Sequence, residues 1–203
     1  MSKLYFRYGA MNCGKTTLLL QVANNYEERG MKVVIIKPFV DTKGNDTIVS
    51  RIGLSRKVDY LIKDDDNIKS YLKSCYNNKV SCVLVDEAQF LNKEHVDELF
   101  LFTKKYNIPV ICYGLRSDFK TEAFPGSLRL FEIADVIEEL YTICRCGKRA
   151  KFNGRIVNGE FVSTGSQVAI DGVDEVCYES LCGKCYLEKV LKIDVNNIDA
   201  EER

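Results

Sequence analysis

Residues 9–17 read GAMNCGKTT, with two glycines separated by four other residues and followed directly by Lys15 and Thr16. This spacing is typical of a phosphate-binding loop, in which glycines let backbone N–H groups approach phosphate oxygens closely. The apolar run 4–8 before the motif predicts a strand, and residues 17–23 after it predict a helix. Because the motif requires this strand and this helix around it, we predict a nucleoside triphosphate site here.

Each position of this loop has an expected task. Lys15 is expected to reach the β- and γ-phosphate oxygens, and Thr16 to offer its hydroxyl group to Mg²⁺. A chance glycine-rich turn is the alternative, but strand, loop and helix agree with one another. The residues that we expect to hold ATP in this loop are Gly9, Ala10, Met11, Asn12, Cys13, Gly14, Lys15, Thr16 and Thr17.

A second motif lies at residues 81–90, where an apolar run predicts a buried strand that ends in Asp86 and Glu87. Ligands of open α/β sheets bind at the carboxyl ends of the strands, so both acids are expected beside the phosphates. In phosphate-loop proteins the first acid of such a pair holds Mg²⁺, directly or through water, and the second can act as a general base. We therefore predict that Asp86 binds ATP-bound magnesium and that Glu87 is the base. The alternative is a pair of solvated acids at a strand end.

The remaining apolar runs predict an α/β fold, because continuous apolar stretches are typical of strands buried in a parallel sheet. The polar stretch 39–57 is expected to be a long flexible loop near the site. His95, the only histidine, is expected on the surface. We predict further strands at 31–37, 58–62, 108–114 and 136–143, and helices at 66–76, 92–105 and 127–134 with Asp66 and Asn92 as N-caps.

Charge and hydropathy limit the classes of function. The chain has 29 basic and 29 acidic residues, so no overall field attracts it to nucleic acid or to an anionic membrane. No apolar stretch is long enough to cross a bilayer, and the N-terminus lacks the pattern of a signal peptide. We expect a cytoplasmic protein with neither a nucleic-acid nor a membrane partner.

Five of the nine cysteines crowd into the last third of the chain. In a cytosolic protein such crowding indicates a metal site more than disulfides. The CxxC at 182–185 has a common zinc-ligand spacing, the CxC at 144–146 is tighter, and Cys177 could compete for a place. The stretch between the two pairs is polar and rich in glycine, and we expect it to lack a core of its own. We predict a closed, structural zinc site formed by Cys144, Cys146, Cys182 and Cys185.

Four segments together carry a resemblance to a known family. They are GAMNCGKTT at 9–17, VLVDEAQF at 83–90, YGLRSDF at 113–119 and DGVDEVCYESLCGKC at 171–185. With the cysteine pairs, they closely resemble the zinc-containing thymidine kinases of bacteria and vertebrates, over almost the whole chain to about residue 190. The resemblance implies a RecA-like α/β domain with a parallel sheet, a lasso loop that closes on the nucleoside, and homotetramers. It also implies transfer of the ATP γ-phosphoryl group to the 5′-hydroxyl of deoxythymidine, with feedback inhibition by dTTP.

The resemblance implies roles for individual residues as well. Glu87 would take the proton from the 5′-hydroxyl, while Lys15, Thr16 and Asp86 would serve the phosphates and Mg²⁺. Asn153 lies near a position that the family often fills with Thr beside the base. The residues implied to contact deoxythymidine are Met11, Phe90, Leu115, Phe119, Val168, Ile170 and Tyr178.

A change in composition near residue 143 suggests a domain boundary. We expect a phosphate-loop α/β domain at residues 1–143, a small zinc-binding lasso domain at 144–192 and a flexible tail at 193–203. The charged sequence of the tail is the reason for expecting it to fray.

Two interpretations from other classes of function stay open. One is a phosphate-loop ATPase coupled to nucleic-acid handling, in which Glu87 would polarise water. The short chain, the zero net charge and the lack of a basic aromatic groove count against it. The other is a zinc ribbon that binds a protein partner, with the ATPase as its regulator. ATP turnover with thymidine alone would distinguish all three.

Overall fold

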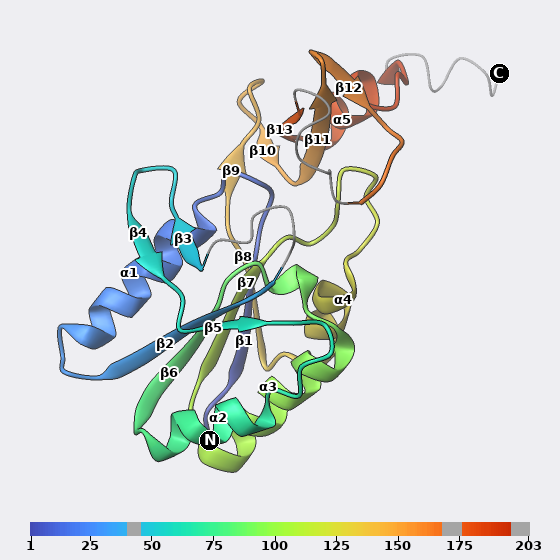
Figure 1. The fold of residues 1–203 in the computed structure, drawn as a ribbon. Helices are drawn as coiled ribbons and strands as arrows, with labels where there is room; N and C mark the ends of the chain where they lie inside the picture. Colours follow the sequence, from blue (N-terminus) through green and yellow to red (C-terminus); the bar gives the residue numbers. More distant parts are fainter. Residues whose placement is uncertain (40–45, 168–175, 196–203) are drawn as a thin grey trace. The chain divides into compact units, whose positions relative to one another are not determined.

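The fold is given by a computed structural model, which describes residues 1–39, 46–167 and 176–195. The chain divides into two compact units (Figure 1). The first unit comprises residues 1–8, 14–116 and 123–140. The second comprises residues 9–13, residues 117–122 and the C-terminal part from Tyr141 onward. Two short segments from the N-terminal two thirds of the chain therefore belong, by their contacts, with its C-terminal part.

The first unit is built on a six-stranded sheet with the order β5-β2-β6-β7-β1-β8, in which every neighbouring pair is parallel. The central strands β6 and β7 are buried along almost their whole length, which explains their continuous apolar sequences. The predicted parallel sheet is thus confirmed. The strands are β1 (Leu4–Tyr8), β2 (Lys32–Pro38), β5 (Tyr60–Ile62), β6 (Val80–Val85), β7 (Val110–Gly114) and β8 (Val136–Glu139).

Helices cover both faces of this sheet (Figure 1). On one face, Leu19 and Ala23 of α1 (Lys15–Glu27) pack with the sheet residues Ile35 and Leu84. On the other face pack α2 (Lys69–Asn77), α3 (Lys93–Tyr106) and α4 (Pro125–Ile133). No helix within the described ranges is long and apolar enough to cross a membrane.

The segment between β2 and β5 differs from its prediction as a long loop. Its described part contains an antiparallel hairpin of β3 (Thr47–Val49) and β4 (Ser55–Lys57). Ile48 is buried, and it packs in the same cluster as Leu19 of α1. A short hairpin anchored by one apolar residue gives little periodic signal, which is why the sequence indicated a loop. Residues 40–45 of the predicted loop lie outside the described residues.

The predicted cap at Asp66 is wrong, whereas the cap at Asn92 is confirmed. Helix α2 begins at Lys69 after Ile68, and the Asp66 carboxylate instead accepts hydrogen bonds from the Tyr60 hydroxyl and the Lys63 N–H. Asn92 Oδ1 accepts from the backbone N–H of His95, as an N-cap should.

The expected surface position of His95 is also wrong. Its side chain is only 2% exposed, and its Nε2 lies 2.9 Å from the carbonyl oxygen of Asp66. Positions 95, 99 and 102 share one face of α3, and Leu99 and Phe102 on that face are buried as well. Helical periodicity therefore placed this histidine inside, although its residue type suggested the outside.

The second unit contains a core that the sequence did not suggest. The strands β11 (Phe152–Val157), β12 (Glu160–Val162) and β13 (Val176–Leu181) form an antiparallel sheet in the order β12-β11-β13. A hairpin of β9 (Thr142–Ile143) and β10 (Arg149–Ala150) precedes it, and α5 (Gly183–Lys189) follows it. The predicted strand 136–143 is thus two strands, of which β8 pairs with β1 and β9 pairs with β10. The core comprises Cys144, Ala150, Leu181, Cys182, Tyr186 and Val190.

Candidate active site and metal centre

In the first unit, the predicted phosphate-binding motif continues into the start of α1. Gly14 is the N-cap, with φ 81° and ψ 20°, a left-handed conformation that favours glycine. Its side chain is a hydrogen atom, so it cannot cap the helix, and the first turn of α1 contains no acidic residue. The partial positive charge of the helix start is therefore left for a bound anion.

The earlier part of the motif, residues 9–13, belongs to the second unit. The backbone N–H of Met11 donates to Asn153 Oδ1 over 2.8 Å, and its carbonyl oxygen accepts a hydrogen bond from the Ser180 hydroxyl. Asn153 also donates from Nδ2 to the carbonyl oxygen of Ser117 over 3.0 Å. Because Asn153 is only 3% exposed, these bonds fix its amide group within the unit. One buried side chain of β11 therefore holds both the loop at Met11 and the loop at Ser117.

Asp86 directly follows β6 in the first unit and is 4% exposed. The Thr16 hydroxyl donates to Asp86 Oδ2 over 3.3 Å, and the N–H of Glu87 donates to Oδ1 over 3.1 Å. Burial, and then the negative charge of Glu87, raise the pKa of Asp86 to about 7. A nearby cation would oppose this shift by stabilising the carboxylate. Hard oxygen donors are the ligands that Mg²⁺ prefers, so Thr16 and Asp86 fit the predicted magnesium site.

Glu87 differs from its neighbour in both exposure and backbone. Its side chain is exposed, and its backbone has φ 50° and ψ 37°, which is uncommon for a residue other than glycine. Its carboxylate Oε2 accepts a hydrogen bond of 2.6 Å from Gln89 Nε2. Strained backbones of this kind cluster at functional sites, where the surrounding contacts maintain them.

Two predicted nucleoside contacts, Phe90 and Leu115, lie in the first unit. The half-buried Phe90 ring meets the Phe124 ring edge to face, with centroids 5.4 Å apart. Leu115 follows β7, and its N–H donates to Gln89 Oε1 over 3.1 Å. Its carbonyl oxygen accepts from the Ser127 hydroxyl. Both residues are thus held by contacts within the first unit.

The second unit contains the predicted nucleoside contacts Phe119 and Tyr178, and Arg155 joins them. Arg155 is 4% exposed, and its guanidinium carbon lies 3.8 Å from the centroid of the Phe119 ring. It donates from Nε to the Tyr178 hydroxyl over 2.9 Å, and its two terminal nitrogens donate to the carbonyl oxygens of Ser166 and Gln167. Val168 and Ile170, which we predicted beside the base, lie outside the described residues.

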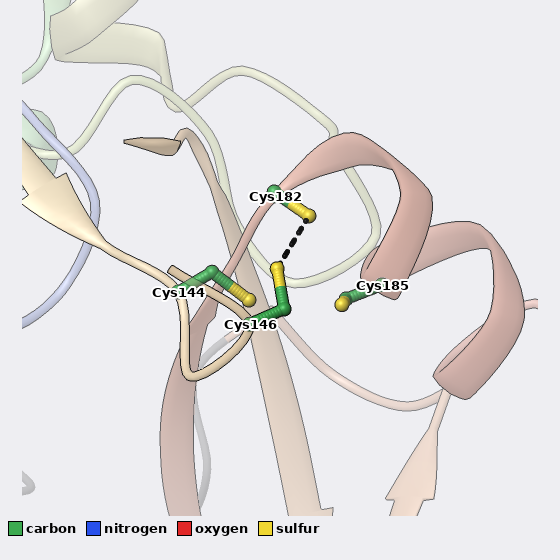
Figure 2. Close-up of side chains that lie close together, drawn as sticks. All are labelled: Cys144, Cys146, Cys182 and Cys185. Atoms are coloured by element: carbon green, nitrogen blue, oxygen red, sulfur yellow. Dashed lines mark hydrogen bonds between the residues drawn. The ribbon is translucent and has the colours of Figure 1, made fainter. Parts of the chain in front are cut away.

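The four cysteines of the predicted zinc site come together in the second unit. Their Sγ atoms all lie within 4.8 Å of one another, and those of Cys146 and Cys182 are 3.5 Å apart (Figure 2). Cys144 and Cys146 come from the turn between β9 and β10, whereas Cys182 is the N-cap of α5 and Cys185 lies in its first turn. Cys177 on β13 is exposed and does not belong to this cluster.

The chemistry of this cluster suits a tetrahedral thiolate site. Zinc–sulfur bonds of about 2.3 Å in a tetrahedron place the sulfurs about 3.8 Å apart, which agrees with the observed crowding. Burial, and then the three neighbouring cysteines, raise the pKa of Cys185 to about 12, so crowding disfavours the thiolate unless a cation is bound. The four cysteines therefore fit the predicted zinc ion.

Comparison with known sequences shows to which family the chain belongs. A family model for thymidine kinase matches residues 2–186. The chain belongs to the thymidine kinase family. It is 49% identical over 176 residues to the thymidine kinase of Legionella pneumophila (strain Paris), covering 85% of this chain and 84% of the relative. It is 42% identical over 197 residues to that of Francisella tularensis subsp. tularensis (strain SCHU S4 / Schu 4), covering 94% and 99%.

A comparison of folds found a weaker likeness. The crystal structure of a DNA replication initiation factor matches with a TM-score of 0.39 and 18% identity, over 69% of this chain and 40% of the other. A likeness at this level gives no support to any particular function.

In this member of the thymidine kinase family, two buried polar residues, Gln89 and Arg155, have roles that the sequence alone does not indicate. Gln89 lies inside the DEAQF motif, so its place beside Glu87 was visible in the sequence. Its contact with Leu115 was not, because it joins positions 26 residues apart. Arg155 lies in the glycine-rich stretch for which the sequence predicts no core of its own, and only the pairing of β11 with β13 brings it to Tyr178.

Proposed function

We propose that this protein transfers the γ-phosphoryl group of ATP to the 5′-hydroxyl of deoxythymidine, giving dTMP and ADP. The main support for this proposal is the arrangement at the end of β6. There, buried Asp86 accepts a hydrogen bond from Thr16 of α1, and exposed Glu87 accepts one from Gln89. Membership in the thymidine kinase family supports the choice of nucleoside and of reaction.

The phosphate-binding residues of this chain orient ATP in the proposed reaction. Backbone N–H groups of residues 9–17 and the ammonium group of Lys15 bind the phosphate oxygens. The Thr16 hydroxyl and the Asp86 carboxylate would hold Mg²⁺, which when bound neutralises charge on the β- and γ-phosphates. Because Asp86 accepts a hydrogen bond from Thr16, contacts within the protein orient its carboxylate.

Glu87 is the proposed general base. Its carboxylate accepts the proton of the 5′-hydroxyl as the 5′-oxygen forms its bond to the γ-phosphorus. The bond from the γ-phosphorus to the bridging oxygen breaks, and ADP leaves with that electron pair. An exposed carboxylate beside a buried one suits this division, because the exposed group can meet an incoming hydroxyl.

Family membership supports the proposal that apolar and aromatic side chains contact deoxythymidine. The residues proposed for this role are Met11, Phe90, Leu115, Phe119 and Tyr178. The tyrosine is oriented by Arg155, whose guanidinium occupies one lone pair of its hydroxyl oxygen. The four clustered cysteines would hold a structural zinc ion, since a full set of protein ligands leaves no position for water.

Family membership alone supports three further proposals. We propose that the protein acts in the cytoplasm, that it assembles as a homotetramer and that dTTP inhibits it as an end product. Light scattering of the purified protein tests the assembly, and initial rates with added dTTP test the inhibition.

The proposed reaction is tested by incubating the protein with Mg-ATP and one nucleoside at a time, without polynucleotide. We expect dTMP from deoxythymidine at a rate well above that of any monophosphate from deoxycytidine or deoxyguanosine. Equal rates for all nucleosides would contradict the proposed substrate. ATP hydrolysis that requires single-stranded DNA would favour the nucleic-acid ATPase instead.

Glu87→Gln tests the assignment of the base. The amide keeps the shape of the side chain and cannot accept the proton, so kcat should fall about a hundredfold to ten-thousandfold. ATP affinity, measured by calorimetry, should change little because the phosphate-binding residues are intact. An unchanged kcat would remove Glu87 from the chemistry.

A further inference from the structure

We infer that Gln89 is a positioning residue, which holds the Glu87 carboxylate in the orientation that accepts the proton. The inference rests on the proposed function of Glu87 as base. The structural basis of the inference is a chain of two hydrogen bonds within the first unit, which runs from the N–H of Leu115 through the Gln89 amide to Glu87 Oε2.

The orientation of the Gln89 amide is fixed by its partners. The backbone N–H of Leu115 can only donate, so the atom of Gln89 that faces it, 3.1 Å away, must be the oxygen Oε1. The NH₂ group then faces Glu87 Oε2 over 2.6 Å. Gln89 is 1% exposed, so its amide group is shielded from solvent and depends on these two protein partners.

The end of β7 leaves just enough room for this side chain. A Cβ atom at Gly114 would lie 2.9 Å from Gln89 Oε1 and 3.1 Å from the Gln89 backbone nitrogen. Both distances are closer than ordinary contacts, so a side chain at position 114 would require Gln89 to shift away from β7. The strand that carries Leu115 therefore sets both the hydrogen bond and the space for Gln89.

The hydrogen bond from Gln89 restricts the rotamers that the Glu87 side chain can adopt. An exposed glutamate side chain ordinarily samples several rotamers, and only some of them direct an oxygen at a given substrate atom. The bond from Gln89 ties Oε2 and thereby orients Oε1, which we assign as the oxygen that accepts the proton. Because proton transfer depends on such alignment, the loss of this bond should slow the chemical step more than it weakens substrate binding.

Gln89→Glu and Gln89→Leu test the inference. Glu keeps an oxygen for the Leu115 N–H and replaces the amide donor with a second carboxyl group beside Glu87, whereas Leu removes both polar contacts. We expect kcat to fall about tenfold to a hundredfold in each, with KM for deoxythymidine and ATP affinity within about twofold of the wild type. Gln21→Leu is the matched control, because Gln21 is exposed on α1, and its kcat should not change.

A double-mutant cycle separates this role from a general structural one. If Gln89 acts through Glu87, then Gln89→Glu should cause little further loss of kcat in the Glu87→Gln background. The same fold-loss in both backgrounds would overturn the inference. So would an unchanged kcat, or a raised KM at normal kcat, which would make Gln89 a substrate contact.

Two further measurements keep the inference testable if a Gln89 variant folds poorly. Gly114→Ala leaves both side chains intact but displaces Gln89, so it should lower kcat in the same way. The side-chain amide resonances of Gln89 should shift in Glu87→Gln, while those of Gln21 stay in place. Unmoved Gln89 resonances would contradict the contact.

A wild type that forms no dTMP would instead refute the proposed function, whereas an active wild type with fully active Gln89 variants refutes only the inference.

Discussion

Asp86 and Glu87 are neighbours with the same functional group, yet the end of β6 gives them opposite environments. Asp86 is buried with a hydrogen bond to each oxygen, whereas Glu87 points to solvent from a left-handed backbone. A buried carboxylate is costly to ionise, and an exposed one is not. The proposed roles, metal ligand for Asp86 and general base for Glu87, rest on this difference in burial.

The raised pKa of Asp86 predicts a pH-dependent contribution to stability in the absence of magnesium. Its pKa is about 7 in the folded chain and about 4 when unfolded. The contribution of Asp86 is therefore fully present below about pH 4 and is lost as pH rises towards about 7. Relative to wild type, Asp86→Asn should gain about 2–4 kcal/mol of unfolding free energy across this window.

Urea unfolding of both proteins at several pH values, with zinc retained and magnesium absent, measures this difference. Added Mg-ATP should stabilise the wild type more than Asp86→Asn at pH 8, because only the carboxylate binds the cation well. A difference in unfolding free energy that stays constant between pH 5 and pH 8 would show that Asp86 titrates normally.

At the scale of elements, the cysteine cluster ties the β9–β10 turn to the start of α5. Cys182→Ala removes one of four ligands and should abolish the binding of about one equivalent of zinc. Zinc is measured by atomic absorption, and the folding of the second unit by proteolysis. Cys177→Ala is the control, since the exposed thiol of Cys177 lies outside the cluster and its loss should leave zinc content unchanged. Full zinc in Cys182→Ala would disprove the assigned ligand set.

Arg155 plays a comparable role for the sheet of the second unit. Its guanidinium links β11 to Tyr178 on β13 and to the main chain at residues 166–167. Arg155→Met keeps an unbranched apolar stem and removes the guanidinium, which leaves three acceptors without this donor, at about 1–3 kcal/mol for each that remains buried. We expect faster proteolysis near residues 166–167 and a stability loss of about 2–5 kcal/mol.

Arg149→Met is the control for this change. Arg149 lies in the same unit on β10, but it is exposed, and its guanidinium lies 3.6 Å from the Tyr141 ring centroid at the surface. Its removal should therefore cost much less. Equal losses of stability in the two variants would show that burial of Arg155 is not what matters.

For the whole molecule, the sequence predicted the parts with strong local signals. The apolar runs of β6 and β7 indicated a buried parallel sheet, and the strand-end acids and cysteine pairs marked Asp86, Glu87 and the metal ligands. Contacts between distant positions were not predictable, because the bonds of Gln89 to Leu115 and of Arg155 to Tyr178 depend on strand pairing. The β3–β4 hairpin was not predicted, because its short strands show only a weak alternation of apolar and polar residues. His95 was predicted on the surface because histidine is usually exposed, although its position on α3 matches the buried face of the helix.

The central claim is that the γ-phosphoryl group goes to a nucleoside hydroxyl and not to water. It is tested by quantifying ADP and dTMP together, with deoxythymidine and with 5′-deoxythymidine, which lacks the accepting hydroxyl group. We predict equal amounts of ADP and dTMP with deoxythymidine, and almost no ADP with the analogue. ADP release that is the same with both nucleosides would show that the protein hydrolyses ATP and would contradict the proposed kinase.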